Sequence, residues 1–121
     1  MAILTRTAGQ LPSLPGSVTA KGLVYTSGLV DPAAMGQDPP PFADQAAAAM
    51  TLLLATLTAA GTDAAHVVKL EAFLADAADF AAWNTEFAKV WPEPGPARTT
   101  LVAVFALPTV RFEVQAVAVL P

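Results

Sequence analysis

Residues 97–120 read ARTTLVAVFALPTVRFEVQAVAVL, and the chain is organised around this stretch. Its Val, Leu and Phe content is typical of largely buried β-strands, which we expect over residues 98–106 and 110–120. Between them, Leu107, Pro108 and Thr109 predict a turn, because proline has no N–H to donate and lies best at the margin of a sheet. The C-terminal quarter of the chain is therefore predicted to supply two strands.

Three ionisable residues interrupt this apolar stretch, namely Arg98, Arg111 and Glu113. Strand alternation puts Arg98 and Thr100 on one face of the first strand. It puts Arg111, Glu113 and Gln115 on one face of the second. If the strands are neighbours, a guanidinium and a carboxylate approach each other across an apolar sheet, where unpaired charges are costly. Two interpretations stay open: a structural ion pair or strand ends that reach water, and an anion site in which Arg98 offers its planar fork to a carboxylate.

The bulk composition is that of one folded domain with an apolar surface. The chain has 121 residues, which suits a single domain over residues 1–121. Hydrophobic residues make up 55% and charged residues 13%, which is too apolar for a disordered chain. We expect the apolar excess to lie in a subunit interface, since interfaces of obligate oligomers resemble a domain core cut in half.

Several classes of function are disfavoured by what the sequence lacks. The net charge of −4 leaves no basic stripe for phosphates, so we expect no nucleic-acid partner. There is no cysteine and only one histidine, His66, so we expect neither thiol chemistry nor a metal site. The first residues lack the apolar core of a secretory signal, and threonines break the apolar run around residues 46–60, which we judge too short to span a membrane. A cytoplasmic protein without a membrane partner is the expectation.

Periodicity along the rest of the chain predicts an α+β fold. Strands are expected over residues 2–7, 18–20, 23–26 and 67–74, and helices over residues 42–60 and 77–90. Lys21-Gly22 is placed to turn a hairpin, Gly61 to end the first helix, and Asp76 to cap the second. This order predicts a mixed β-sheet with two helices packed on one face. The other face must also be covered, because its strands are apolar on both sides.

The motifs PARTTLVAVFALP and RFEVQAVAVL together resemble the C-terminal signature of the RidA/YjgF family of imine deaminases. In that family an Arg follows Pro-Ala, a Ser or Thr follows the Arg, and a Leu-Pro turn leads to a strand carrying Glu-aliphatic-Glu-Ala. Thr26-Ser27-Gly28 resembles a strand exit of the family, and Asp79-Phe80 followed by Asn84 matches its Asp-Phe-x-x-x-Asn pattern. The resemblance covers nearly the whole chain. It implies a chorismate-mutase-like fold, assembled as a homotrimer with ligand pockets between subunits.

The resemblance also implies a reaction, the hydrolysis of reactive 2-imino acids to 2-keto acids and ammonia without a cofactor. Arg98 falls on the arginine that binds the substrate carboxylate, and Glu113 on the acidic residue that positions water at the imine. These two are the predicted catalytic residues. The other predicted substrate-binding residues are Ser27, Gly28, Thr100 and Asn84. Taken alone, Ser27-Gly28 also suits an ordinary strand exit, and Asn84 an exposed helical position.

Two positions depart from the family pattern. Leu14 stands where many members have a Tyr that faces the substrate, and Gln115 replaces the second Glu of the last strand. These departures keep open a second hypothesis, a non-catalytic trimeric protein that binds a small carboxylate through Arg98. A third hypothesis is RNA cleavage or translation inhibition, which some family members have been assigned. The acidic pI and the single histidine disfavour it.

Overall fold

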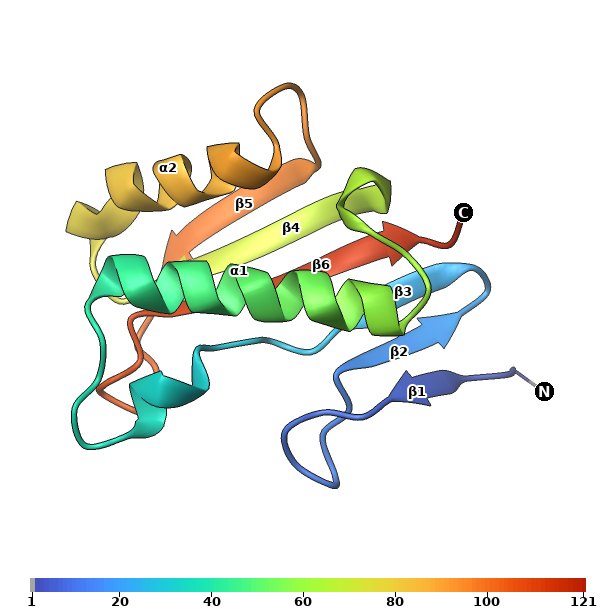
Figure 1. The fold of residues 1–121 in the computed structure, drawn as a ribbon, viewed down its shortest axis with the longest axis horizontal. Helices are drawn as coiled ribbons and strands as arrows, with labels where there is room; N and C mark the ends of the chain where they lie inside the picture. The colour runs from blue at the N-terminus through green and yellow to red at the C-terminus, as the bar shows by residue number, and fades with distance from the viewer. Residues whose placement is uncertain (1) are drawn as a thin grey trace.

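One six-stranded sheet forms the body of the protein, and its strand order is β1-β2-β3-β6-β4-β5 in a computed structural model that describes residues 2–121 (Figure 1). The strands are β1 (Thr5–Thr7), β2 (Ser17–Ala20), β3 (Leu23–Thr26), β4 (Val67–Leu74), β5 (Ala97–Val102) and β6 (Phe112–Val119). All pairs are antiparallel except β4 with β5, which is parallel. The predicted mixed sheet is therefore present, although β1 and β5 are shorter than expected.

The two C-terminal strands are not neighbours. β4 lies between β5 and β6, so β5 forms one edge of the sheet while β6 lies inside it (Figure 1). The chain leaves the sheet after Val102, and the amide of Ala103 still donates to the carbonyl of Leu74 at 2.8 Å. The expected short turn is thus a longer connection over residues 103–111. The idea that Arg98 and Glu113 approach each other across adjacent strands is wrong for a single chain.

The β2–β3 hairpin forms as predicted, across Lys21 and Gly22. Both residues have positive φ, 50° and 77°, which is the conformation that favours a two-residue hairpin turn. Glycine adopts this region without a steric penalty, and Lys21 adopts it at some conformational cost. The turn sets the register between β2 and β3, which pairs Tyr25 with Val18. On its other side Tyr25 pairs with Val117 of β6.

Both helices lie on one face of the sheet (Figure 1). They are α1 (Phe42–Ala59) and α2 (Phe80–Val90), with short 3-10 turns at η1 (Pro32–Met35), η2 (Ala64–His66) and η3 (Ala77–Asp79). Gly61 ends α1 with φ of 90°, while the amides of Gly61 and Thr62 donate to the carbonyls of Thr58 and Leu57. Asp76 accepts from the amide of Ala78 and so caps η3, which means that α2 proper begins three residues later than expected.

Helix α1 is long and apolar enough to cross a membrane by length and composition alone, so the sequence argument that this segment is too short was wrong. Its place in the fold gives it another role. Ala46, Leu53 and Leu57 are fully buried and belong to the same core as Val24, Phe112 and Val114. The apolar stripe of α1 is therefore the wall of the core that covers the sheet.

The two faces of the sheet differ in cover. Phe112, Val114 and Ala118 of β6 are fully buried towards the helices. The residues between them face the other way and are only half-buried. This open face presents apolar side chains together with four polar or charged positions on β4 and β6: Leu23, Tyr25, Phe73, Leu101, Val117 and Val119, with Lys69, Glu71, Glu113 and Gln115. No segment of residues 2–121 covers it.

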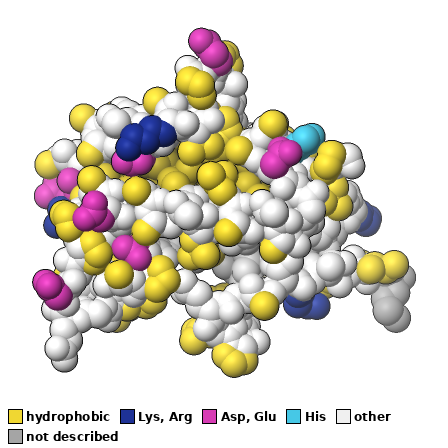
Figure 2. Space-filling view, in the orientation of Figure 1, with side chains coloured by type: hydrophobic (Ala, Val, Ile, Leu, Met, Phe, Trp, Pro, Cys, Tyr) yellow, Lys and Arg dark blue, Asp and Glu magenta, His cyan; other side chains and the backbone are white. Residues whose placement is uncertain are grey.

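The helix-covered side carries few charges (Figure 2). Hydrophobic atoms lie between the two helices, and the acidic and basic side chains visible on this side are scattered toward its periphery. Such a surface offers no continuous basic track for a nucleic-acid backbone.

Candidate functional site

Helix α2 holds the guanidinium of Arg98. Arg98 projects from β5, and its Nη2 donates to Oδ1 of Asn84 at 2.9 Å. Its Cζ lies 4.7 Å from the ring centroid of Phe87, 5.7 Å from that of Trp83 and 5.8 Å from that of Phe80. These four helix residues recur at three- and four-residue spacing and so share the face of α2 that meets the sheet. The rings attract the cation through their faces, and the amide fixes its rotation.

Arg98 has no carboxylate partner within residues 2–121. The ion pairs in this part of the chain join Asp63 to His66, Glu86 to Lys89, and Asp79 to Arg111. Arg98 is half-buried, yet its only side-chain hydrogen bond there is to a neutral amide. A structural ion pair between Arg98 and Glu113 is therefore excluded within one chain, and the guanidinium keeps donors for an external anion.

Thr100 lies on the same face of β5 as Arg98. Its Oγ1 accepts a hydrogen bond from Nε1 of Trp83 at 3.0 Å. Trp83 is fully buried, so this bond connects the candidate site to the core. Helical spacing places Trp83 on the apolar face of α2 but does not predict this contact. The one available signal was that a buried indole needs a partner for its N–H.

Glu113 lies on the opposite face of the sheet from Arg98. Arg98 is in register with Leu70, which is fully buried beneath the helices. Glu113 is in register with Phe73, one of the open-face residues. Because side chains alternate between the two faces, a single chain cannot bring these two predicted catalytic residues to the same ligand.

The carboxyl group of Glu113 is unpaired and partly desolvated. Within the described residues it forms neither an ion pair nor a side-chain hydrogen bond, and burial raises its pKa above the usual range. It packs against Gly28 so closely that a Cβ at that position would collide with the carboxylate. Beside it lies a hollow of about 150 Å³ whose other walls are apolar: Val30, Met35, Phe105, Ala106, Leu107 and Val110. A carboxyl group with these properties is suited to proton transfer.

Ser27 and Gly28 lie where β3 separates from β6. Oγ1 of Thr26 accepts from the amide of Ala116 at 3.0 Å, and pairing resumes only at Leu29 with Val114. Ser27 donates through Oγ to the carbonyl of Pro15 at 2.6 Å, so its hydroxyl anchors the preceding loop. No acceptor within residues 2–121 receives the amide of Gly28. Of these two predicted binding residues, Gly28 lies next to Glu113 and presents a free N–H, whereas the Ser27 hydroxyl is already occupied.

The two departures from the family pattern have local consequences. Leu14 and Ser27 line the same cavity of about 250 Å³, so the missing Tyr would have stood beside the Ser27-Gly28 edge. Gln115 is in register with Glu71, and its Nε2 donates to Oε1 of Glu71 at 3.3 Å. A second glutamate at this position would oppose Glu71 directly, and Gln115 removes that repulsion.

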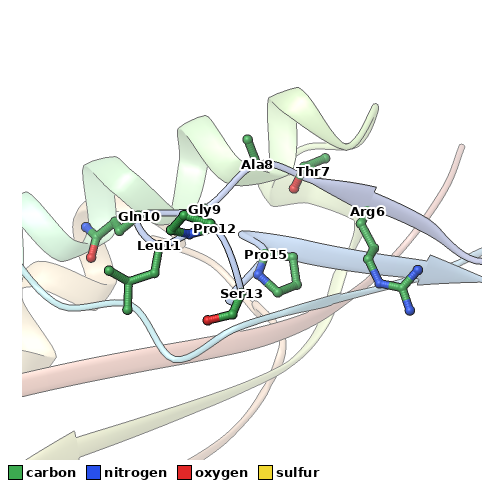
Figure 3. A pocket seen from close by; sticks show the side chains of 9 residues that line it. All are labelled: Arg6, Thr7, Ala8, Gly9, Gln10, Leu11, Pro12, Ser13 and Pro15. Atoms are coloured by element: carbon green, nitrogen blue, oxygen red, sulfur yellow. The ribbon is translucent and has the colours of Figure 1, made fainter.

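A hollow larger than those beside Gly28 and Glu113 lies away from the candidate site. It measures about 690 Å³ and follows the loop after β1, and no predicted site residue lines it. Figure 3 shows that the Arg6 side chain points away from the loop residues Gln10, Leu11 and Ser13. Among residues 2–121, no three acidic or histidine side chains are grouped to hold a metal ion.

Comparison with known proteins agrees with this architecture. The sequence model of the family described as Endoribonuclease L-PSP matches residues 13–120. The chain belongs to this family, the RidA/YjgF family. A YjgF-family protein from Neisseria meningitidis has the same fold with a TM-score of 0.84, at 27% identity over 98% of this chain and 96% of that one. The α+β fold with two helices on one face of a mixed sheet is thereby confirmed.

Two sequence relatives frame the question of activity. The mitochondrial protein mmf1 of Schizosaccharomyces pombe is 36% identical over 107 residues, which is 84% of this chain and 65% of mmf1. The chloroplastic Reactive Intermediate Deaminase A of Arabidopsis thaliana is 45% identical over 65 residues, or 53% of this chain and 34% of that protein. The aligned region thus spans less than two thirds of either relative. One name states a deaminase and the other states no activity.

Proposed function

We propose that this protein hydrolyses reactive 2-imino acids to 2-keto acids and ammonia. The observation that carries the proposal is a half-buried arginine without an acidic partner, Arg98, held in place by Asn84 and three aromatic rings. An arginine fork matches a substrate carboxylate in two parallel hydrogen bonds. The deaminase named among the relatives supports the same reaction.

In the proposed reaction, Arg98 binds the carboxylate and Glu113 handles protons. The oxygen of a water attacks the imine carbon, and the carboxylate of Glu113 accepts one proton from that water. That proton then passes to the nitrogen, which gives a carbinolamine whose hydroxyl keeps the second proton of the water. When this second proton also moves to the nitrogen, the carbon–nitrogen bond breaks with its electron pair on nitrogen, the carbonyl of the 2-keto acid forms, and ammonia leaves. The burial that raises the pKa of Glu113 makes its carboxylate a stronger base for the first step. The N–H of Gly28 is available to orient the substrate beside it.

We further propose that each site is shared between two subunits of a homotrimer. Arg98 and Glu113 lie on opposite faces of one sheet, so the ligand would meet Arg98 of one chain and Glu113 of the next. Two features support an assembly: the open face is largely apolar, and on and beside the edge strand Leu101 is 53% and Val104 fully exposed. A head-to-tail contact of this kind closes into a ring when the rotation permits.

Mixed trimers test the shared site directly. Arg98→Ala and Glu113→Gln chains would be co-expressed with different affinity tags, and trimers carrying both tags would be isolated. Each chain alone should be inactive, whereas every mixed trimer has one site with both intact residues, so about one third of wild-type activity should return. Mixed trimers without activity, although wild-type trimers are active, would contradict a shared site.

Ammonia release tests the reaction itself. Freshly generated 2-iminopropanoate should lose ammonia faster with wild-type protein than spontaneously. Glu113→Gln should bind 2-oxobutanoate, a product-like acid, but no longer accelerate the release. A wild-type rate equal to the spontaneous rate would reject the deaminase.

A carboxylate-binding protein without catalysis is the second candidate. Leu14 favours it, because it brings an apolar side chain to the cavity edge where family members have a hydroxyl. That candidate predicts binding of 2-oxobutanoate without ammonia release. We place RNA cleavage behind both, since the net charge is −4 and the single histidine, His66, is bonded to Asp63 on the surface.

A further inference from the structure

Two consecutive residues of α2 contact two alternate residues of β5. Asn84 accepts from Arg98, and Trp83 donates to Thr100. Residues two apart on a strand are roughly 6–7 Å apart along it, so one small ligand can reach both. The contacts therefore fix two polar side chains at a single place, between the edge strand and the helix.

The Trp83 contact determines which role the hydroxyl of Thr100 can take. An indole N–H only donates, so Oγ1 of Thr100 must be the acceptor in this bond. The hydroxyl proton of Thr100 then points elsewhere, and no group within residues 2–121 accepts it. Thr100 thus presents a free donor on the same side of β5 as the Arg98 guanidinium.

Trp83 is itself rigid. It is fully buried, its ring lies 4.8 Å from that of Phe112 on the central strand, and it meets Phe87 edge to face at 5.8 Å. Phe87 is also the ring nearest the Arg98 guanidinium. The orientation of Thr100 and that of Arg98 therefore depend on the same aromatic cluster.

We propose that Thr100 is the second hydrogen-bond donor to the substrate carboxylate, and that Trp83 is the positioning residue that gives Thr100 this role. The inference rests on the proposed function, because it assumes that Arg98 binds a carboxylate. One oxygen of the carboxylate would accept from Arg98 and the other from the Thr100 hydroxyl. Trp83 touches no ligand: its N–H acts through Thr100, while its ring also faces Arg98, a contact that another aromatic ring can supply.

Calorimetric binding of 2-oxobutanoate to the full-length protein tests this proposal. Thr100→Val keeps the shape but removes the donor, and should weaken binding about 10- to 100-fold, as expected for a hydrogen bond to a charged group. Thr100→Ser should restore most of the affinity. Trp83→Phe frees the hydroxyl to visit three staggered positions and should weaken binding about threefold. In the Thr100→Val background, Trp83→Phe should cause no further loss.

The chain offers a matched control in its other tryptophan. Trp91 also donates its indole N–H, to the carbonyl of Ala64 at 3.0 Å, and also packs on Phe87. Trp91→Phe should lower the melting temperature but leave the affinity unchanged. KM should rise in Trp83→Phe while kcat changes little, since the lost contact orients the carboxylate and not the reacting carbon.

Three outcomes would overturn the inference, and they are distinguishable. If wild type does not bind 2-oxobutanoate, the Arg98 site and the proposed function fail together. If wild type binds and Thr100→Val binds equally well, only the donor role of Thr100 fails. If Trp83→Phe weakens binding as much in the Thr100→Val background as alone, or no more than Trp91→Phe does, Trp83 acts through its ring contact with Arg98 or through general stability, and not through Thr100.

Discussion

Arg98 is the residue on which ligand binding should depend. Arg98→Lys keeps the charge but loses the planar fork and the stacking against Phe87. We expect it to weaken 2-oxobutanoate binding by about 2 kcal/mol or more, measured by calorimetry. The fold should persist, because no acidic group in the described chain loses a partner.

Arg111→Lys is the matched control for this change. Arg111 lies two residues from Glu113, pairs with Asp79 at 3.0 Å, and takes no part in the cation-π contacts that hold Arg98. The Arg111→Lys variant should bind 2-oxobutanoate with the affinity of wild type. Equal losses in the two variants would show that the effect is one of overall charge, and a fully binding Arg98→Lys would reject the carboxylate fork.

Glu113 should make stability depend on pH. Its folded pKa is raised by burial, so the folded chain holds a proton on this carboxyl that the unfolded chain has already released. Stability therefore falls as the pH rises from the unfolded pKa through the higher folded pKa. Glu113→Gln removes this pH-dependent loss of stability, so the variant should melt at or above the wild-type temperature at neutral pH. The difference between the two melting temperatures should vanish below about pH 4, where the wild-type carboxyl is protonated in both the folded and the unfolded chain. A clearly lower melting temperature at neutral pH would mean that the ionised carboxylate is stabilised by contacts beyond the single chain.

At the scale of elements, α1 is anchored by one buried amide. Nε2 of Gln45 donates to the carbonyls of Pro40 at 2.9 Å and Thr109 at 3.1 Å, and its Oε1 accepts from the amide of Arg111 at 2.8 Å. Gln45 is fully buried. One side chain thus joins the start of α1 to the segment that leads into β6, which carries Glu113.

Gln45→Glu tests this anchor with almost no change in shape. It places a carboxylate oxygen against two carbonyl oxygens, and should destabilise the fold by about 3 kcal/mol at neutral pH in denaturant unfolding. The loss should shrink at low pH, because the protonated acid can donate again. Gln37→Glu, at an exposed position, is the control and should change stability little. Equal stability of Gln45→Glu and wild type at neutral pH would remove Gln45 from its structural role.

At the scale of the whole molecule, the open sheet face should be an interface. Light scattering should give a mass near that of three 12.4 kDa chains at micromolar concentration. Val117, on β6 between Tyr25 and Lys69, lies near the middle of this face. Val117→Asp should dissociate the assembly, because desolvating a carboxylate between subunits is costly even with Lys69 opposite it, whose ammonium already donates to Oγ1 of Thr99.

Ala55→Asp is the control for this surface. Ala55 is exposed on α1, on the opposite side of the molecule from the open face. The variant should keep the mass of wild type. A monomeric wild type would reject the trimer, and a Val117→Asp variant with an unchanged mass would move the interface away from the open face.

Local patterns predicted much of this fold. The bounds of β4 coincide with the predicted residues 67–74, the hairpin turns at Lys21-Gly22, and α1 ends before Gly61. These features depend on neighbours in sequence: strand alternation, backbone sterics at glycine, and helical spacing. The sequence also showed the family motif around Arg98. Strand alternation likewise predicted that Glu113 and Phe112 point to opposite faces of the sheet.

Only the tertiary structure decided how these pieces meet. Alternation assigns a residue to one face of its own strand, but which faces coincide depends on strand order, and here β4 separates β5 from β6. That insertion puts Arg98 under the helices and Glu113 on the open face. The contact of Trp83 with Thr100 arises in the same way, because α2 and β5 are joined by packing and not by periodicity. The sequence by itself determined the candidate residues for the chemistry, and long-range pairing decided that one chain cannot bring Arg98 and Glu113 together.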